Sequence, residues 1–127
     1  MISKIMFTSN LGNWERIIDF GNGSNNNNIL FSRYSVANQL AFNFGSNISA
    51  TTTFLSPNII AQNQACICVA RYDPFTSNGT STIWYNGSNI ATSNQMAVSL
   101  GADRTVTNIY VGQSEWGGRC IFKCKYL

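Results

Sequence analysis

The sequence predicts an all-β domain built as an antiparallel β-sandwich or jelly roll, and three observations support this. Only 10% of the residues are charged, so the chain lacks the Glu and Lys that cover the solvent face of an exposed helix. The polar residues are instead mostly Asn, Ser, Thr and Gln, which suit strands and turns. Short apolar stretches also alternate with turn residues about every ten positions, as in sandwich folds.

Alternating apolar residues define the expected strands. In the segment 39–44, Leu40, Phe42 and Phe44 share one face, and Gln39 and Asn43 share the other. The segment 65–72 is apolar on both faces, so we expect a central strand that is covered on both sides. Further strands are expected at residues 1–7, 16–20, 29–31, 108–112 and 120–126.

The sharpest local signal is a β-hairpin. Asn86-Gly87 stands between two strand-like runs, 82–85 and 88–91. A type I′ turn requires positive φ at both central residues, and Asn-Gly satisfies this requirement better than almost any other pair. We therefore expect the chain to reverse at Asn86-Gly87.

Length and charge limit the classes of protein that remain. A chain of 127 residues is expected to form one domain, spanning 1–127, as a module of a larger protein. The net charge is +3 and the basic residues are scattered, which argues against nucleic-acid binding. No apolar run reaches the roughly 20 residues that span a bilayer, and residues 1–7 do not resemble a signal peptide. We expect neither nucleic-acid binding nor membrane insertion.

Three segments, in order along the chain, resemble the LamG-like (laminin G, concanavalin A-like) jelly-roll family. They are Gly12-Asn13-Trp14-Glu15-Arg16-Ile17-Ile18-Asp19-Phe20-Gly21 with Asn28-Ile29-Leu30-Phe31-Ser32-Arg33, the hairpin Ile83-Trp84-Tyr85-Asn86-Gly87, and Asn108-Ile109-Tyr110-Val111-Gly112-Gln113-Ser114-Glu115-Trp116. The resemblance implies a single LamG-like domain of an extracellular or cell-surface protein. Members of that family bind glycans, glycosaminoglycans or proteins, sometimes with calcium, so the resemblance alone does not name a ligand.

This sequence also departs from the family pattern. The family usually has a further strand before the first of these segments, a Trp near the position of Ala65, and a short acidic segment after the last strand. The domain is therefore expected to be shortened at one or both ends. A shortened sheet would leave an open edge, where a protein partner could pair.

The residues that could carry catalysis are few. The chain contains no His, which excludes Ser-His-Asp and Cys-His arrangements. Glu15 and Asp19 would share a strand face about 13 Å apart at roughly 3.3 Å per residue, too far apart for a retaining glycosidase pair. We expect Glu15 to be exposed and Asp19 to be held by turn hydrogen bonds. The sequence therefore predicts no enzymatic activity.

The four cysteines leave three alternatives open. Cys66 and Cys68 share one face of an expected strand, and Cys120 and Cys124 share one face of another. Buried thiols are favoured, a disulfide between the two strands comes next, and a metal site comes last. No cofactor is expected, although calcium could be bound by oxygen ligands near loops. The candidates for that role are Asp19, Asp73 and Asp103.

Loop aromatics beside amides and guanidinium groups are the expected ligand-binding residues. Sugars stack their C–H faces on aromatic rings and bond their hydroxyls to planar amides or Arg. One candidate site contains Trp116 with its neighbours Gln113, Ser114 and Arg119, and a second contains Arg33, Tyr34 and Asn38. For Trp116, capping one end of the core is an equally good interpretation.

The function predicted from the sequence is non-catalytic, lectin-like recognition of a carbohydrate or glycoconjugate. The alternative is a structural, adhesion or assembly module that binds protein partners. A degenerate glycosidase-like jelly roll is the third and least favoured reading, because of the carboxylate spacing.

Overall fold

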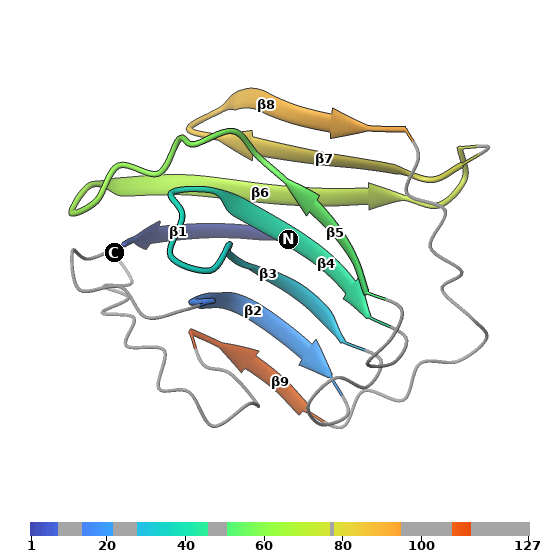
Figure 1. Cartoon of the computed structure of the whole chain (residues 1–127), viewed down its shortest axis with the longest axis horizontal. Helices are drawn as coiled ribbons and strands as arrows, with labels where there is room; N and C mark the ends of the chain where they lie inside the picture. The colour runs from blue at the N-terminus through green and yellow to red at the C-terminus, as the bar shows by residue number, and fades with distance from the viewer. Residues whose placement is uncertain (8–13, 22–27, 46–50, 77, 95–107, 113–127) are drawn as a thin grey trace.

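The chain folds as a sandwich of two antiparallel β-sheets. The computed structural model describes residues 1–7, 14–21, 28–45, 51–76, 78–94 and 108–112. In this part of the chain, the first sheet has the order β1-β6-β7-β8 and the second has the order β5-β4-β3-β2-β9. Figure 1 shows the strands of the first sheet crossing those of the second. The all-β antiparallel sandwich predicted from the sequence is confirmed.

The strand bounds lie close to those expected from the alternation. The first sheet contains β1 (Ile2–Met6), β6 (Ala65–Asp73), β7 (Thr80–Tyr85) and β8 (Ser88–Ser93). The second contains β2 (Arg16–Gly21), β3 (Ile29–Arg33), β4 (Leu40–Gly45), β5 (Thr51–Leu55) and β9 (Asn108–Val111). Sequence analysis missed β5, whose three consecutive Thr residues show no apolar alternation. The strand expected at 120–126 lies outside the described residues.

The core lies between the two sheets. In β6 the buried residues Cys66, Cys68 and Ala70 alternate with more exposed ones, because successive side chains of a strand point to opposite faces, whereas all six residues of β4 are buried. Phe42 of β4 packs between Phe31 and Phe44, with ring centroids 6.2 Å and 4.5 Å away. Phe44 reaches across to Tyr72 of β6, with ring centroids 4.9 Å apart, so aromatic contacts tie the sheets together.

The prediction that β6 is covered on both sides is wrong. The strand is central, with β1 on one side and β7 on the other. Its inner face is buried through Cys66, Cys68 and Ala70, but Ile67 on the outer face is 47% exposed. Apolar residues on both faces therefore reflect a core on one face and an uncovered apolar surface on the other.

The predicted hairpin is confirmed. Asn86 and Gly87 have φ angles of 49° and 84°, as a type I′ turn requires, and they join β7 to β8. The Asn86 side chain adds a further bond, because its Oδ1 accepts from the Ile67 amide at 2.9 Å. The turn is thereby tied to β6 as well as to its own two strands.

A β-bulge in β2 changes which side chains share a face. Ile17 is the extra residue, because Arg16 and Ile18 pair with successive residues of β3. Ile17 is buried in the core, and Arg16 and Asp19 come to lie on the outer face with Arg16 Nε 3.7 Å from Asp19 Oδ2. Regular alternation would have placed Arg16 and Asp19 on opposite faces.

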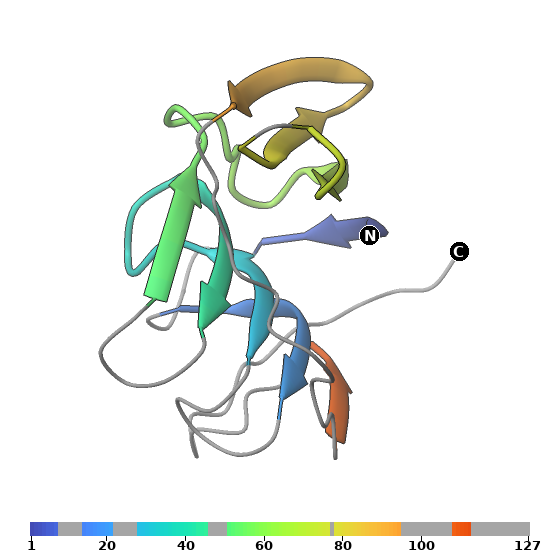
Figure 2. The same cartoon turned by 90° about the vertical axis from the view of Figure 1, so that its right-hand side faces the viewer.

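The second sheet extends past the edge of the first. In Figures 1 and 2, β9 lies beyond β1, on the side away from β6. Ile109 and Val111 of β9 are 62% and 56% exposed. The described residues contain no helix of the length and apolar character needed to cross a bilayer.

Cys66 and Cys68 are free thiols inside the core. Their Sγ atoms are 3.6 Å apart on the inner face of β6, and the two residues are 2% and 0% exposed. The hydrogen bond to Cys66, burial and the neighbouring Cys66 charge all raise the pKa of Cys68. Among the alternatives for these two cysteines, the structure shows the buried thiols. Cys120 and Cys124 lie outside the described residues.

We predict that Cys66 and Cys68 react with a thiol reagent only after unfolding. Burial blocks access to both sulfur atoms, and the raised pKa of Cys68 lowers its thiolate fraction further. The measurement is alkylation without reductant, in buffer and in denaturant, followed by peptide mass mapping. Two alkyl groups on the peptide that holds both residues are expected in denaturant only. Fast labelling of the native protein, or unlabelled cysteines in denaturant, would contradict the buried-thiol assignment.

Candidate functional site

A hydrogen-bonded polar turn lies at the end of the first sheet, between β6 and β7. Asp73 is the last residue of β6, and Pro74 follows it with a fixed φ and no backbone N–H to satisfy. Asp73 Oδ1 accepts from the Phe75 amide at 3.1 Å, which closes an Asx turn. Its other oxygen, Oδ2, accepts from Arg71 Nη2 at 3.0 Å. One carboxylate therefore fixes both a strand side chain and the turn backbone.

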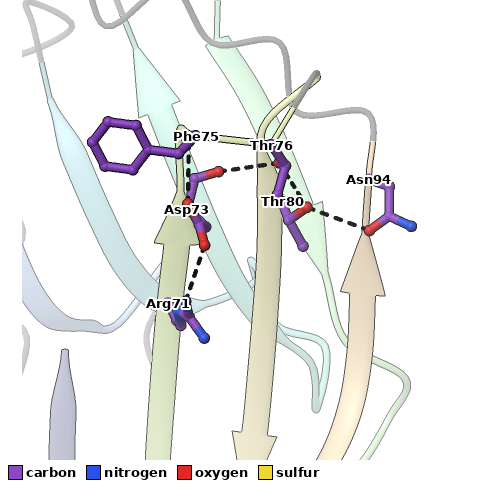
Figure 3. Close-up of polar contacts among 6 residues, drawn as sticks. All are labelled: Arg71, Asp73, Phe75, Thr76, Thr80 and Asn94. Carbon is purple, nitrogen blue, oxygen red and sulfur yellow. Dashed lines mark hydrogen bonds and ion pairs between the residues drawn. The ribbon is translucent and has the colours of Figure 1, made fainter.

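Hydroxyl groups extend this network to β7 and β8. The Oγ1 atoms of Thr76 and Thr80 are 2.9 Å apart, and Thr76 Oγ1 also donates to the Asp73 carbonyl at 3.4 Å. Thr80 Oγ1 lies 3.5 Å from Asn94 Oδ1, just past the end of β8. The turn closes where the Gly79 amide donates to the Thr76 carbonyl, with Gly79 at a φ of 66°. These bonds join the ends of three strands (Figure 3).

Phe75 sits at the tip of this turn and is 96% exposed. Figure 3 shows its ring pointing away from the hydrogen-bonded cluster. A large apolar side chain so fully in water contributes almost nothing to the stability of the fold, because it buries no surface. Its backbone amide is nevertheless fixed by Asp73, so the ring is presented from an ordered support. This combination is typical of a contact residue for a ligand.

The chemistry available at the turn is recognition. An exposed aromatic face can stack on the C–H face of a sugar, and nearby guanidinium, carboxylate, hydroxyl and amide groups can bond its hydroxyls. Arg71 is 65% exposed at its side chain and Asp73 is 29% exposed, so the pair is open to a ligand. We call Arg71, Asp73, Phe75, Thr76, Thr80 and Asn94 the Phe75 turn. Sequence analysis missed it as a binding site, although an aromatic directly after Asp-Pro in a turn was a usable signal.

The second candidate site from the sequence has a different structure from the one expected. Arg33 is 2% exposed, and its guanidinium is fully engaged. Its Nη1 lies 3.4 Å from Glu15 Oε2, its Nε donates to the Ala37 carbonyl at 2.7 Å, and its Nη2 donates to the Val36 carbonyl. Arg33 therefore holds the loop after β3 in place, and its guanidinium faces no solvent.

Tyr34 and Asn38 lie on the loop that Arg33 organises. Tyr34 is half-buried and packs edge-on against Trp14, with ring centroids 4.8 Å apart. The Asn38 side chain is exposed, while its carbonyl accepts from the amides of Ile59 and Ile60 at 2.8 and 3.0 Å. The structure thus brings Arg33 and Tyr34 together, but the Tyr34 ring is half-buried, whereas the ring at the Phe75 turn is 96% exposed.

The expected exposure of Glu15 is wrong. Glu15 is 4% exposed, and it binds Arg33 through both its side chain and its carbonyl, which accepts from the Arg33 amide at 2.9 Å. Asp19 is fully buried beside Arg16, and Asn28 Nδ2 lies 3.5 Å from its Oδ1. Both carboxylates are therefore held by charged or polar partners of the fold, and neither is presented to a substrate.

Of the remaining residues predicted to bind a ligand or calcium, the structure describes only some. Trp116, Gln113, Ser114 and Arg119 lie outside the described residues, as does Asp103. Asp19 and Asp73 lie on different sheets, so the structure does not bring these two calcium candidates together. Within the described ranges, no group of three or more His, Cys, Asp or Glu residues is placed to hold a metal ion. Calcium binding stays a prediction.

Comparison with known proteins shows the fold. No protein-family model and no curated protein matches the sequence. Among solved structures, two of similar fold are the CBM40 carbohydrate-binding module of the Ruminococcus gnavus IT-sialidase, one of them bound to α2,3-sialyllactose. Their TM-scores are 0.71 and 0.70, with 15% sequence identity over 90% of this chain. This chain spans 63% and 62% of those chains, less than two thirds of their length.

Two of the ion pairs, the buried Arg33–Glu15 and the exposed Arg71–Asp73, give a matched stability test. Arg33→Met should lower the free energy of unfolding by about 3–5 kcal/mol, because it leaves the Glu15 carboxylate buried without its counter-charge. Arg71→Met should cost less than about 1 kcal/mol, because the Arg71–Asp73 pair is solvated. The measurement is urea unfolding of both variants and the wild type. Equal losses for the two variants would contradict the structural role assigned to Arg33.

Proposed function

We propose that this chain is a non-catalytic carbohydrate-binding module with its ligand site at the Phe75 turn. The observation that carries the proposal is a fully exposed Phe75 ring held beside open polar side chains. The fold supports it, because two solved structures of similar fold are carbohydrate-binding modules, one of them bound to a sialylated sugar. Fold alone does not determine function, so the site has to carry the argument.

Recognition at the Phe75 turn would work by stacking and hydrogen bonding. The Phe75 ring supplies an apolar plate for the C–H face of a pyranose. Arg71 donates to ring or hydroxyl oxygens, Asp73 accepts from hydroxyls, and Asn94 does both. Since Asp73, Thr76 and Thr80 are already fixed to one another, binding would order few side chains and its entropic cost would be small.

We also propose that the module belongs to a larger protein outside the cell or on its surface. The LamG-like resemblance and the sandwich fold both suit a glycan-binding module within a larger extracellular or cell-surface protein. Its ligand would then be a glycan or glycoprotein on another surface. The loop aromatic Trp116, with Gln113 and Arg119 near it in the sequence, stays a second candidate site for the same function.

A second function, assembly through a sheet edge, is favoured by one observation. Ile109 and Val111 of β9, the last strand of the second sheet among the described residues, are 62% and 56% exposed, although Ile18, the register partner of Val111, packs against the core. An exposed apolar edge strand is a site where another chain can pair. Sedimentation of the purified protein over a range of concentrations tests this function, and a monomer throughout would exclude self-assembly.

We predict that Phe75→Ala loses at least about tenfold in affinity for the glycan that the wild type binds, because the stacking surface is gone. Phe75→Tyr keeps a ring and should retain most of the affinity. The measurement is glycan-array binding with acidic and neutral glycans, with and without a calcium chelator, beside Trp116→Ala. Binding lost only in Trp116→Ala would move the site to that loop. A folded protein that binds no glycan would overturn the proposed function.

A further inference from the structure

The outer face of the first sheet carries a partly exposed tryptophan. Trp84 of β7 alternates with Ile83 and Tyr85, which are buried in the core, so its indole lies on the outer face. Its register neighbours are Val69 of β6 and Asn89 of β8, which therefore flank it on the same face. An indole on an open sheet face, between an apolar and an amide side chain, offers both kinds of contact that a sugar ring needs.

The polar groups beside Trp84 are fixed in position. A β-bulge in β8 makes Ile90 the extra residue, and it brings Asn89 and Thr92 onto the outer face together. Asn89 Nδ2 donates to Thr92 Oγ1 at 3.1 Å, and the reverse contact to Asn89 Oδ1 measures 3.4 Å. Both side chains are exposed. Their remaining donors and acceptors are available to a ligand lying on the indole.

Trp84 and the first residues of the Phe75 turn lie on the same outer face of the first sheet. Arg71, Thr82 and Thr92 form the next row of the sheet, and Asp73 and Thr80 form the row after it. Trp84 and Thr80 are four residues apart in β7, which is about 13 Å at roughly 3.3 Å per residue. We call this surface the Trp84 platform, made of Val69, Arg71, Trp84, Asn89 and Thr92, with Thr82, which is only 8% exposed, between them. It is longer than one pyranose ring, and the Phe75 turn begins at its Asp73–Thr80 end.

The charge on this surface narrows the class of ligand. Arg71 and Asp73 are paired at 3.0 Å and neutralise each other. The other exposed polar groups of the platform are the Thr92 hydroxyl and the Asn89 amide, so the charges within the platform balance. Lys4 lies on the same outer face on the neighbouring strand β1, opposite Ile67 of β6 and outside the platform. A surface with aromatic rings, hydroxyls and no net charge matches an uncharged polyhydroxylated chain better than a polyanion.

We infer that the outer face of the first sheet is a binding track for an uncharged linear oligosaccharide. One sugar stacks on Trp84, an inner sugar crosses the Arg71–Thr82 row, and another contacts Phe75. The inference rests on the proposed function and adds to it the length and charge class of the ligand. Affinity should therefore rise with chain length until the ligand reaches from one ring to the other.

The test is a length series. Linear β-1,4-linked glucose, mannose and xylose oligomers, from the monomer to the hexamer, are titrated calorimetrically into the wild type and into Trp84→Ala. At least one series should gain about tenfold or more in affinity with length, and Trp84→Ala should lose this gain while its affinity for the shortest bound oligomer is unchanged. Tyr110→Ala removes an aromatic from the outer face of the second sheet and should bind as the wild type does.

A fluorescence arm localises the contact and reports on folding. Replacing Trp14 and Trp116 with Phe leaves Trp84 as the only indole of the chain. The hexamer of the series that binds should change the emission of Trp84, and its monomer should not. The thermal unfolding curve of each variant shows whether it is folded.

Three results would overturn the inference, and they separate it from the proposed function. Equal affinity for short and long oligomers, with Trp84→Ala unaffected and Phe75→Ala impaired, would leave only the site at the Phe75 turn. Array binding of charged or branched glycans, without binding of any linear neutral series, would refute the ligand class alone. If the protein binds no glycan but self-associates, and Trp84→Ala abolishes self-association, the platform is a protein interface and both proposals fail.

Discussion

The register between β6 and β7 is the constraint on which both the core and the proposed binding surface depend. With Ala70 opposite Ile83, the thiols of Cys66 and Cys68 face inward, while Val69 and Trp84 face outward together. Because strand side chains alternate with a period of two, a slip of one residue would place Trp84 in the core and Ile83 in water. The bond from the Ile67 amide to Asn86 Oδ1 secures this register at one end of the pair, and the 2.9 Å contact between the Thr76 and Thr80 hydroxyls links the turn after β6 to β7 at the other.

The second sheet is held by a different kind of interaction. Glu15 and Arg33 are both buried, and the pair anchors the chain entering β2 to the loop that follows β3. Such a pair adds little net stability compared with apolar residues, but once present it penalises any arrangement that separates its charges. The role that we assign to Arg33 is therefore to specify the loop of Tyr34 and Asn38. The face of the molecule that we propose for ligand binding belongs to the other sheet.

The strands and the hairpin that have a local sequence signal could be predicted from the sequence, whereas the position of the proposed binding site could not. The alternation of Leu40, Phe42 and Phe44 predicts a strand, and Asn86-Gly87 predicts a turn. Each of these signals is contained within a few neighbouring residues. The Thr-rich β5 has no such pattern, and the burial of Glu15 depends on a partner that is distant in sequence. Its place after Asp-Pro marks Phe75 as a turn aromatic, but only the exposure of its ring identifies it as a contact residue. Trp84 becomes part of a platform only through the register of three strands.

The central claim is that the ligand lies on the outer face of the first sheet. The most direct measurement is nitrogen-15 amide and indole NMR of the protein during titration with the tightest glycan found on the array. The account predicts that the perturbed signals are those of Arg71, Phe75 and Asn94 together with the Trp84 indole N–H. Perturbations confined to Tyr34, Asn38 or Trp116, with the Trp84 signal unmoved, would contradict it.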